Sequence, residues 1–408
     1  MFTFIKIALR NIIRNKRRSL ITVSAVGFGL GALIFIWSFV DGAHIQMIEN
    51  YTSLLTGHIQ IHSRGFNQRE QLEINISNPQ EIINIIEDES PLVEASPRIK
   101  AFGLISSPEY SSGIIILGVD PLQEIKVSSL HKRLKSGEFL DEAESNEIVI
   151  GESLARNLNV SLGDKVVIMS QAFDGSIAAG AYYVKGVLDT GAEEIDKSVV
   201  LIAYDAAQEL FVMPDRASEI VLRLENVENS PAEALKFRQL LSGKGLEVLP
   251  WQEISPILKQ WIEFDNGFIW IIVMVVMIVV AIGILNTVLM GVLERTREFG
   301  ILLSIGTRRR QIITTVAWES LFLGVIGSLI GLCIGYFLSV YFGTAGIDLS
   351  VFTQALSSFY MEAVIYPRLS LGHLLTSMAL VLFTSIIVSV YPAWHAANLK
   401  PVEAIRSI

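Results

Sequence analysis

The chain is poor in charged residues and has almost no cysteine. Only 18% of its 408 residues are Asp, Glu, Lys or Arg, whereas soluble globular proteins have about 25%. The mean hydropathy is +0.48, which argues against a purely cytosolic enzyme and predicts long lipid-facing segments. The single cysteine, Cys333, excludes an intrachain disulfide and a zinc site built from cysteines. The formal net charge of −9 disfavours a nucleic-acid-binding protein, because such proteins carry basic faces.

The sequence also lacks the common catalytic motifs. It has neither a G-x-S-x-G elbow nor an H-E-x-x-H zinc motif. His58 and His62 are four residues apart on a predicted strand, a separation of about 13 Å that is too long for one shared metal ion. We therefore expect two surface or pocket histidines. Ser242-Gly243-Lys244-Gly245 lacks the first glycine and the following Ser/Thr of a phosphate loop. We expect no catalytic residue, no metal and no cofactor on this chain.

Four apolar segments are long enough to cross a membrane. The first, Ser19–Val40, has no charged residue and covers a hydrocarbon core of about 30 Å as a helix. A cleaved signal peptide is the alternative, but the apolar run is too long and lacks a small-residue cleavage site. The predicted transmembrane helices are residues 19–41, 267–293, 311–342 and 371–394.

The distribution of basic residues predicts the orientation. Six basic residues and no acidic residue precede the first span, and five arginines lie between the second and third spans. Short basic segments stay in the cytoplasm, so we expect both termini, the segment 294–310 and the tail 395–408 there. Residues 42–266 and the short loop 343–370 are then external. The region from Asp41 to Asn266 has 18 basic and 35 acidic residues, so the acidic character belongs to the exported part.

The exported region mixes strand and helix patterns. Residues 57–62 alternate like a strand, 79–88 have the periodicity of an amphipathic helix, and short strands with Gly/Asp turns fill the middle. The predicted fold class is therefore a membrane all-α protein with four transmembrane helices, one plus three, and a large α+β extracytoplasmic domain. This domain is expected to have two subdomains, with a β-rich insert at about 111–216.

Small and polar residues within the spans predict helix contacts. Small residues four apart permit close helix packing, either within this chain or with another. The residues with this spacing are Gly27, Gly31, Gly327, Gly331 and Gly335. Asn286 is expected to form an interhelical hydrogen bond. Glu319 is expected to pair with Arg308–Arg310 rather than to transport protons, because it lies near the cytoplasmic edge.

Two cytoplasmic segments are amphipathic. Residues 1–18 predict a helix that lies on the inner leaflet, and a purely topogenic role of its basic residues is the alternative. The segment Glu294–Gly306 combines charges with an apolar run of Phe299, Ile301, Leu302 and Ile305. A short helix lodged in a groove of a cytoplasmic partner would need these apolar residues, and a helix lying flat on the inner leaflet is the alternative.

Four stretches of the sequence resemble MacB/FtsX-type ABC-transporter permeases. They are R-T-R-E-F-G-I-L-L-S-I-G (295–306), A-L-R-N-I-I-R-N-K-R-R (8–18), I-V-I-G-E-S-L-A-R-N-L-N-V-S-L-G-D-K-V (148–166) and Y-P-A-W-H-A-A-N-L-K-P-V-E-A-I-R (391–406). With the one-plus-three layout of spans, the resemblance covers essentially the whole chain. Within the family, the length and the Y-P-A-W ending are most similar to the lipoprotein-releasing (LolC/LolE-like) permeases.

The resemblance implies a multi-pass protein of the bacterial inner membrane with a periplasmic domain. Two permeases, a second copy or a paralogue, would bind a cytoplasmic ABC ATPase dimer that carries ATP-Mg. Closure of the ATPases would be relayed to the periplasmic domains, an action called mechanotransmission. A periplasmic lipoprotein carrier or adaptor is a further expected partner. The implied ATPase-docking residues are Glu294, Arg295, Arg297, Glu298, Phe299, Gly300, Ile301, Leu302, Ser304 and Gly306.

Three functions are compatible with this layout. The first is the release of lipoproteins, with Trp37, Phe39, Phe268 and Trp270 as candidate acyl-chain contacts; an interfacial aromatic belt is the alternative role for these residues. The second is MacB-like export of drugs or peptides with a periplasmic adaptor. The third is FtsX-like regulation of cell-wall hydrolases without transport. A membrane-anchored enzyme ranks last because no catalytic set is present.

Overall fold

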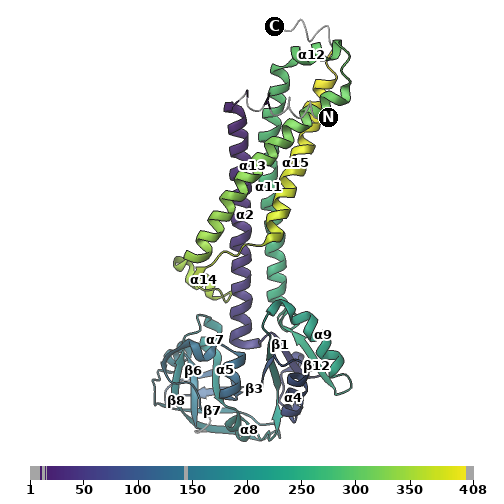
Figure 1. Cartoon of the computed structure of the whole chain (residues 1–408). Coiled ribbons are helices and arrows are strands. Elements are labelled where there is room, and N and C mark those ends of the chain that lie inside the picture. Colours follow the sequence, from purple (N-terminus) through teal and green to yellow (C-terminus); the bar gives the residue numbers. More distant parts are fainter. Residues whose placement is uncertain (1–9, 12–13, 15, 142–145, 401–408) are drawn as a thin grey trace. The chain divides into compact units, whose positions relative to one another are not determined.

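The computed structural model describes residues 10–11, 14, 16–141 and 146–400 (Figure 1). The predicted amphipathic segment 1–18 and the C-terminal motif therefore lie partly outside the described residues. The chain forms two compact units. The first contains the chain up to His44, Ile262–Asp348 and the chain from Val364 onward, and the second contains Ile45–Trp261 and Leu349–Ala363.

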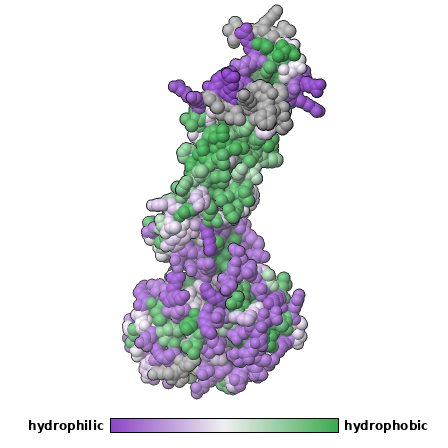
Figure 2. Space-filling model, viewed as in Figure 1, coloured by the Kyte–Doolittle hydropathy of each residue, from purple (hydrophilic) through white to green (hydrophobic). Residues whose placement is uncertain are grey.

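Four long helices build the first unit, and each is long and apolar enough to cross a membrane. They are α2 (Lys16–Tyr51), α11 (Pro256–Glu294), α13 (Arg309–Ala345) and α15 (Leu371–Ala397). A short helix α12 (Thr296–Ser304) follows α11, and β13 (Ile347–Asp348) pairs with β14 (Val364–Ile365). Figure 2 shows hydrophobic residues gathered on the surface of these long helices. The predicted one-plus-three set of transmembrane helices is thus confirmed.

Two of these helices are longer than the predicted spans. The helix α2 continues eleven residues beyond Val40, because residues 41–51 contain no proline that would stop it. The helix α11 begins at Pro256, eleven residues before Gly267. Proline is favoured at the first position of a helix, where its missing N–H is not needed. The apolar runs in the sequence therefore predicted the lipid-compatible parts of these helices, but they did not predict where the helices begin and end.

A ten-stranded mixed sheet forms the centre of the second unit. Its order is β12-β1-β11-β3-β4-β9-β6-β8-β5, and β7 pairs with both β3 and β8. The strands are β1 (Ile59–Ser63), β3 (Glu94–Ser106), β4 (Ser111–Val119), β5 (Leu134–Gly137), β6 (Glu147–Gly151), β7 (Lys165–Gln171), β8 (Ile177–Leu188), β9 (Val199–Ala203), β11 (Glu219–Arg223) and β12 (Leu246–Pro250). A separate pair joins β2 (Ile76–Ser77) to β10 (Arg216–Ala217). The α+β character of this domain confirms the predicted fold class.

Short helices cover and connect the strands. They are α3 (Phe66–Arg69), α4 (Pro79–Glu89), α5 (Pro121–Val127), α6 (Glu152–Leu158), α7 (Glu193–Ser198), α8 (Tyr204–Leu210), α9 (Ser230–Leu240) and α10 (Trp251–Ile254), with single turns η1 (Thr52–Thr56), η2 (Leu130–Arg133) and η3 (Val227–Asn229). The segment between α13 and α15 adds η4 (Ser350–Phe352) and α14 (Thr353–Ser357). Residues 349–363 of that segment belong to the second unit.

The strand β3 connects two hydrophobic cores. Its first half pairs with β11 and its last four residues pair with β7. One core contains residues of β1, α4, β11 and α9, and the other contains residues of β4, β6, β8 and β9. Because one sheet passes through both, the subdomain boundaries at 111 and 216 stay predictions.

The strand β1 has two chemically different faces. Ile59 and Ile61 are fully buried in the first of these cores, together with Ile83 of α4. The side chains of Gln60 and His62 point to the other face, as the two-residue period of a strand requires. This alternation, which the sequence predicted, places Gln60 and His62 in the wall of a cavity.

Candidate functional site

The helix α12 forms a hairpin between two long helices. The helix α11 ends at Glu294, Arg295 occupies the N-cap of α12, and α13 begins at Arg309. The turn after α12 contains Gly306 at φ +94°, a backbone conformation that glycine adopts without steric cost. The predicted cytoplasmic segment is therefore a short helix with a tight turn at its end.

One face of α12 packs inside this chain. Phe299 is 1% exposed and lies in the same core as Ile312, Val316 and Ala396. Gly300 is also buried. The resemblance placed Phe299 and Gly300 at the ATPase contact, but the structure buries them against the protein's own helices. The reason is the helical period, which puts Phe299 on the same face as Leu303, a residue packed against that core, and puts Ile301 and Ile305 on the opposite face.

The opposite face of α12, with Leu302 at its edge, is apolar and exposed. Ile301, Leu302 and Ile305 are 45%, 38% and 73% exposed. Ser304, Gly306 and Arg297 are exposed as well, and so are the three arginines 308–310. This exposed surface of Ile301, Leu302 and Ile305, with the arginines beside it, is here called the α12 patch. It is part of the segment predicted to dock an ATPase.

A network of ion pairs holds the start of α12. The Arg295 guanidinium lies 5.0 Å from the centroid of the Phe299 ring and donates to Glu319 Oε1 at 2.8 Å and to Glu298 Oε2 at 2.9 Å. Asn11 Nδ2 also donates to Glu319 Oε1, at 2.5 Å. Burial opposes the charge of Glu298, but Arg295, together with Arg14 at 3.1 Å, outweighs it and lowers the pKa of Glu298. A further pair joins Arg18 to Glu294.

The partner predicted for Glu319 was wrong. Its cation is Arg295 and not one of Arg308–Arg310. Arg310 precedes Glu319 by nine residues on α13, which is about 13 Å along the axis and beyond the reach of an arginine. Arg295 reaches Glu319 because the hairpin brings the start of α12 against α13, a tertiary contact that spacing in the sequence does not show. Arg309 instead donates to Asn398 Oδ1 at 3.0 Å.

The glycine stripes of α2 and α13 interlock within this chain. A Cβ atom at Gly331 would lie 2.7 Å from Leu30 Cβ and 2.8 Å from the carbonyl oxygen of Gly27. Gly327 and Gly335 meet Val26 and Ile34 of α2 equally closely, and Gly31 meets Ile334 of α13. All five predicted glycines therefore lie at one helix–helix contact, where the missing side chains allow the backbones to approach.

The candidate acyl-chain contacts differ in their exposure. Trp37 is buried, stacks on His373 at a centroid distance of 4.6 Å and meets Trp270 edge-on at 5.9 Å. Phe39 is half-buried, whereas Phe268 and Trp270 are more than half exposed. Trp37 therefore serves as a packing residue, and only the α11 pair presents a free aromatic surface.

The polar contacts between the spans include pairs that the sequence did not suggest. Asn286 is exposed and makes no side-chain hydrogen bond with the described residues, so its predicted interhelical bond is not found. The neighbouring Thr287 bonds Thr22 instead.

Two His–Asp pairs also tie the helices together. His373 Nδ1 lies 2.7 Å from Asp41, and His44 Nε2 lies 2.9 Å from Asp265. In the sequence, these pairs are indicated only by acidic and histidine residues at the ends of the apolar runs.

Comparisons with known proteins identify two matching family models. The MacB-like periplasmic core domain matches residues 19–239, and the FtsX-like permease C-terminal domain matches residues 270–401. The first match covers more than half of the chain, and the second runs from within α11 to the end of α15.

Named relatives match over nearly the whole chain. The lipoprotein-releasing system transmembrane protein LolC of Neisseria meningitidis is 21% identical over 95% of this chain and 94% of its own length. The macrolide export ATP-binding/permease protein MacB 2 of Aeromonas hydrophila is 23% identical over 98% of this chain but only 60% of its own length.

Two solved domains are also similar to part of the chain. The periplasmic region of MacB from Actinobacillus actinomycetemcomitans is 20% identical, with a TM-score of 0.37, over 53% of this chain and 97% of its own length. The extracellular domain of the transporter YknZ is 15% identical, with a TM-score of 0.35, over 48% of this chain and 99% of its own. The family-model matches, together with the four long apolar helices, show that this chain belongs to the FtsX/MacB family of ABC-transporter permeases.

Proposed function

We propose that this chain is the permease subunit of a lipoprotein-releasing ABC transporter of the inner membrane. An ATPase subunit binds the α12 patch from the cytoplasm, and its ATP-driven closure moves the periplasmic domain. The observation that carries the proposal is the division of α12 into a buried face, which anchors it, and the exposed apolar patch, which is free for a partner.

The α12 patch has the chemistry of a docking helix. Complete burial of an isoleucine or leucine contributes about 1.5–3 kcal/mol, so the three exposed side chains can supply a large part of a specific contact. Arg297 and the arginines 308–310 lie beside them and favour a groove with an acidic rim, which would set the register of the complex. A helix lying on the inner leaflet would use the same residues, and the experiments below separate these two roles.

The buried face of α12 is suited to transmit force. Phe299 is locked into the core, and the Arg295–Glu319 pair joins α12 to α13 at 8% and 12% side-chain exposure. Removing one member of such a largely buried pair costs about 3–5 kcal/mol, because the other charge is left without a partner. When α12 moves, α13 is therefore expected to move with it, because the contacts between the two helices do not yield.

The cargo assignment rests on the length of the match to LolC. That relative is named as part of a lipoprotein-releasing system and is covered over 94% of its length. Phe268 and Trp270 on α11 offer an exposed aromatic surface that suits acyl chains. Export of a macrolide is the second candidate, because the MacB relative matches 98% of this chain.

The test of the cargo is ATPase stimulation in lipid nanodiscs. The full chain is reconstituted with its ATPase, and hydrolysis is measured with a triacylated lipoprotein, with the same polypeptide lacking acyl chains, and with a macrolide. We expect stimulation by the acylated protein only, together with its release from the nanodisc. Stimulation by the macrolide alone would replace the proposal with drug export, and a complex that responds to neither would favour the non-transporting regulator.

The docking claim has a matched pair of variants. Replacing both Ile301 and Ile305 by serine removes the exposed apolar surface without touching the core, so the ATPase should no longer copurify. Ile177→Ser is the control, because Ile177 is 80% exposed in the second unit. Retention of a stimulated ATPase by the double variant would contradict docking through the α12 patch.

A further inference from the structure

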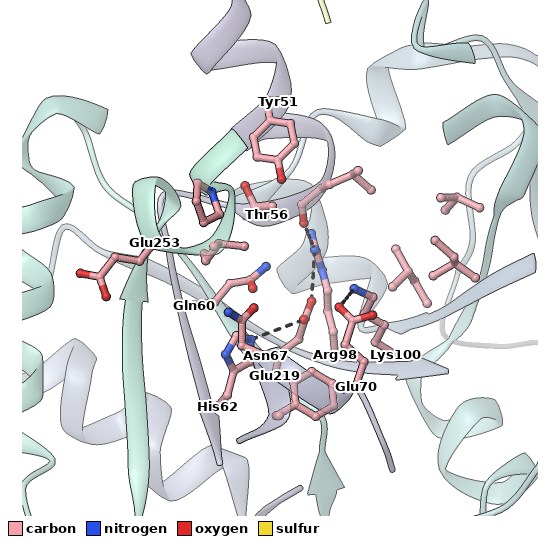
Figure 3. A pocket seen from close by; sticks show the side chains of 17 residues that line it. Tyr51, Thr56, Gln60, His62, Asn67, Glu70, Arg98, Lys100, Glu219 and Glu253 are labelled. Atoms are coloured by element: carbon pink, nitrogen blue, oxygen red, sulfur yellow. Dashed lines mark hydrogen bonds and ion pairs between the residues drawn. The ribbon is translucent and has the colours of Figure 1, made fainter. Parts of the chain in front are cut away.

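A polar cavity lies in the second unit, apart from the α12 patch. Its volume is about 410 Å³, and it is lined by the end of the η1 turn, β1, β3, β11 and the start of α11 (Figure 3). Its polar lining includes Tyr51, Gln60, His62, Arg98, Lys100 and Glu219. A cavity of this size accommodates a small molecule.

Three charged or titratable residues form a row across neighbouring strands. His62 of β1 is opposite Glu219 of β11, and Glu219 is opposite Arg98 of β3. The side chains are 1%, 5% and 1% exposed. Glu219 is therefore a buried carboxylate in the wall of the cavity, with a histidine on one side and a guanidinium on the other.

The two cations of the cavity are already occupied by other groups. Arg98 donates to Glu124 at 2.6 and 3.0 Å and to the carbonyl oxygen of Leu55. Lys100 Nζ donates to Glu70 Oε1 at 2.6 Å. Each cation is therefore already paired with a carboxylate, so its charge is compensated before any ligand binds.

Two hydrogen-bond acceptors in the cavity, the Glu219 carboxylate and the Gln60 amide oxygen, lack close donors. The nitrogens nearest to Glu219 belong to Arg98 and His62 and lie 3.7 and 3.8 Å away, which is longer than a hydrogen bond. Gln60 is 5% exposed and makes no side-chain hydrogen bond with the described residues. Figure 3 shows its amide directed toward the open middle of the cavity. A buried polar group without a partner is costly, so this arrangement points to a missing donor.

The charge of the surroundings is negative. Arg98 and Lys100 face the three carboxylates of Glu70, Glu124 and Glu219. Burial opposes the charge of Glu219, but the interactions with His62, Lys100 and Arg98 outweigh it and lower its pKa. The lowered pKa indicates that Glu219 is ionised at neutral pH, and the three carboxylates outnumber Arg98 and Lys100 by one.

We propose that this cavity binds a small organic cation with an ammonium or guanidinium group. The N–H groups of the ligand donate to the Glu219 carboxylate and to Gln60 Oε1, and the cation compensates the excess negative charge. Tyr51 and Phe66 also line the cavity, and aromatic rings attract organic cations. An anion of the same size would meet Glu219 and is excluded by repulsion.

The place of the cavity suggests a regulatory consequence of binding. Tyr51 ends α2, Thr56 ends the η1 turn that follows it, and Pro256 begins α11; all three line the cavity. A ligand bound here contacts the ends of both helices and holds their positions in the second unit. Binding would therefore restrict the motion of this unit that transport requires.

The test is calorimetric titration of the full chain in detergent. The probe is agmatine, which carries both an ammonium and a guanidinium group, and succinate is the anionic counterpart. We expect saturable binding of agmatine at one site and no binding of succinate. Gln60→Met and Glu219→Gln should each weaken agmatine binding at least about tenfold, because each removes an acceptor for a charged donor. Glu228→Gln removes an exposed carboxylate outside the cavity and should change nothing.

Several results would overturn the proposal. They are the absence of saturable heat with agmatine, spermidine and ethanolamine at about 10 mM, tighter binding of succinate, or an unchanged affinity in Gln60→Met. The last variant nearly conserves side-chain volume, so it decides the question if Glu219→Gln proves unstable. The thermal unfolding midpoint of each variant without ligand shows whether it is folded.

Discussion

The ionisation of His58 links the stability of the second unit to pH. His58 is buried, and its Nδ1 accepts a hydrogen bond from the backbone N–H of Leu224 at 3.1 Å. Burial, reinforced by the positive charge of Arg223, lowers the pKa of His58 to about 4. Protonation of Nδ1 would also remove this hydrogen bond, so the geometry and the pKa agree.

The expected pH dependence has a definite sign. The unfolded histidine has a pKa of about 6.5, so between pH 6.5 and 4 the unfolded chain binds more protons than the folded chain. The contribution of His58 to the free energy of unfolding is therefore fully present above pH 6.5. It is lost as the pH is lowered through this window, and the total loss is about 3 kcal/mol.

The variant His58→Asn isolates this contribution. Asparagine keeps an oxygen in place of Nδ1 but does not titrate. Its thermal unfolding midpoint should therefore fall less between pH 7 and pH 4.5 than that of the wild type. An identical pH profile in the two proteins would show that His58 is not responsible.

The pair Arg98–Glu124 is expected to be important for stability. Both side chains are at most 1% exposed. Glu124→Gln should lower the free energy of unfolding by about 3–5 kcal/mol, because the Arg98 charge stays buried. Glu94→Gln is the matched control, since its exposed pair with Lys126, at 3.6 Å, should contribute less than about 1 kcal/mol. Equal effects of the two variants in thermal unfolding would contradict this account.

At the scale of residues, the sequence showed which side chains are polar but not which ones meet. The alternation of β1 predicted that Gln60 and His62 share a face. Glu219 and Arg98 are more than 100 residues apart, and only the strand order β1-β11-β3 brings them together. The cavity was not predicted for this reason.

At the scale of elements, α12 has a buried face and an exposed face, and we expect only the buried face to contribute to stability. Phe299→Ala should destabilise the chain by about 3–5 kcal/mol, because it opens a cavity in the helical core. Ile301→Ser should leave the unfolding midpoint nearly unchanged, because that side chain is exposed. Both midpoints can be measured in the same detergent by intrinsic fluorescence. A large loss in Ile301→Ser would show that the exposed face also packs within the chain.

The contact between α2 and α13 depends on its glycines. Gly331→Ala would place a methyl group 2.8 Å from the backbone oxygen of Gly27, and the resulting overpacking should cost about 1–3 kcal/mol. Gly267→Ala on α11 meets no atom within 4 Å and should be neutral or stabilising by up to about 1 kcal/mol. If Gly331→Ala were as stable as Gly267→Ala, the close contact would be wrong.

Long apolar runs and small-residue spacing made these helices predictable from sequence. The four spans and the glycine stripes follow from composition and from the helical period. The partner of Glu319 did not follow, because it depends on how the hairpin folds back. The burial of Phe299 was missed because an amphipathic pattern shows that two faces differ but not which face meets the rest of the chain.

At the scale of the whole molecule, the chain belongs to a family of ABC-transporter permeases, and such a permease implies an ATPase partner. The four apolar helices and the periplasmic core domain indicate an inner-membrane protein with a periplasmic domain. Two of the boundaries between its two units fall within α2 and α11, and the other two lie on either side of residues 349–363. Each of these helices thus carries residues of both units without a break in the helical backbone, and we expect them to carry the motion.

The central claim is that an ATPase subunit binds the α12 patch from the cytoplasm. The most direct test places photoreactive benzoyl-phenylalanine at position 305 in the full chain and irradiates intact cells. We expect a covalent adduct with a P-loop ATPase, identified by mass spectrometry, and no such adduct from position 177. Adducts of position 305 with lipid alone, or an ATPase adduct from position 177, would contradict the claim.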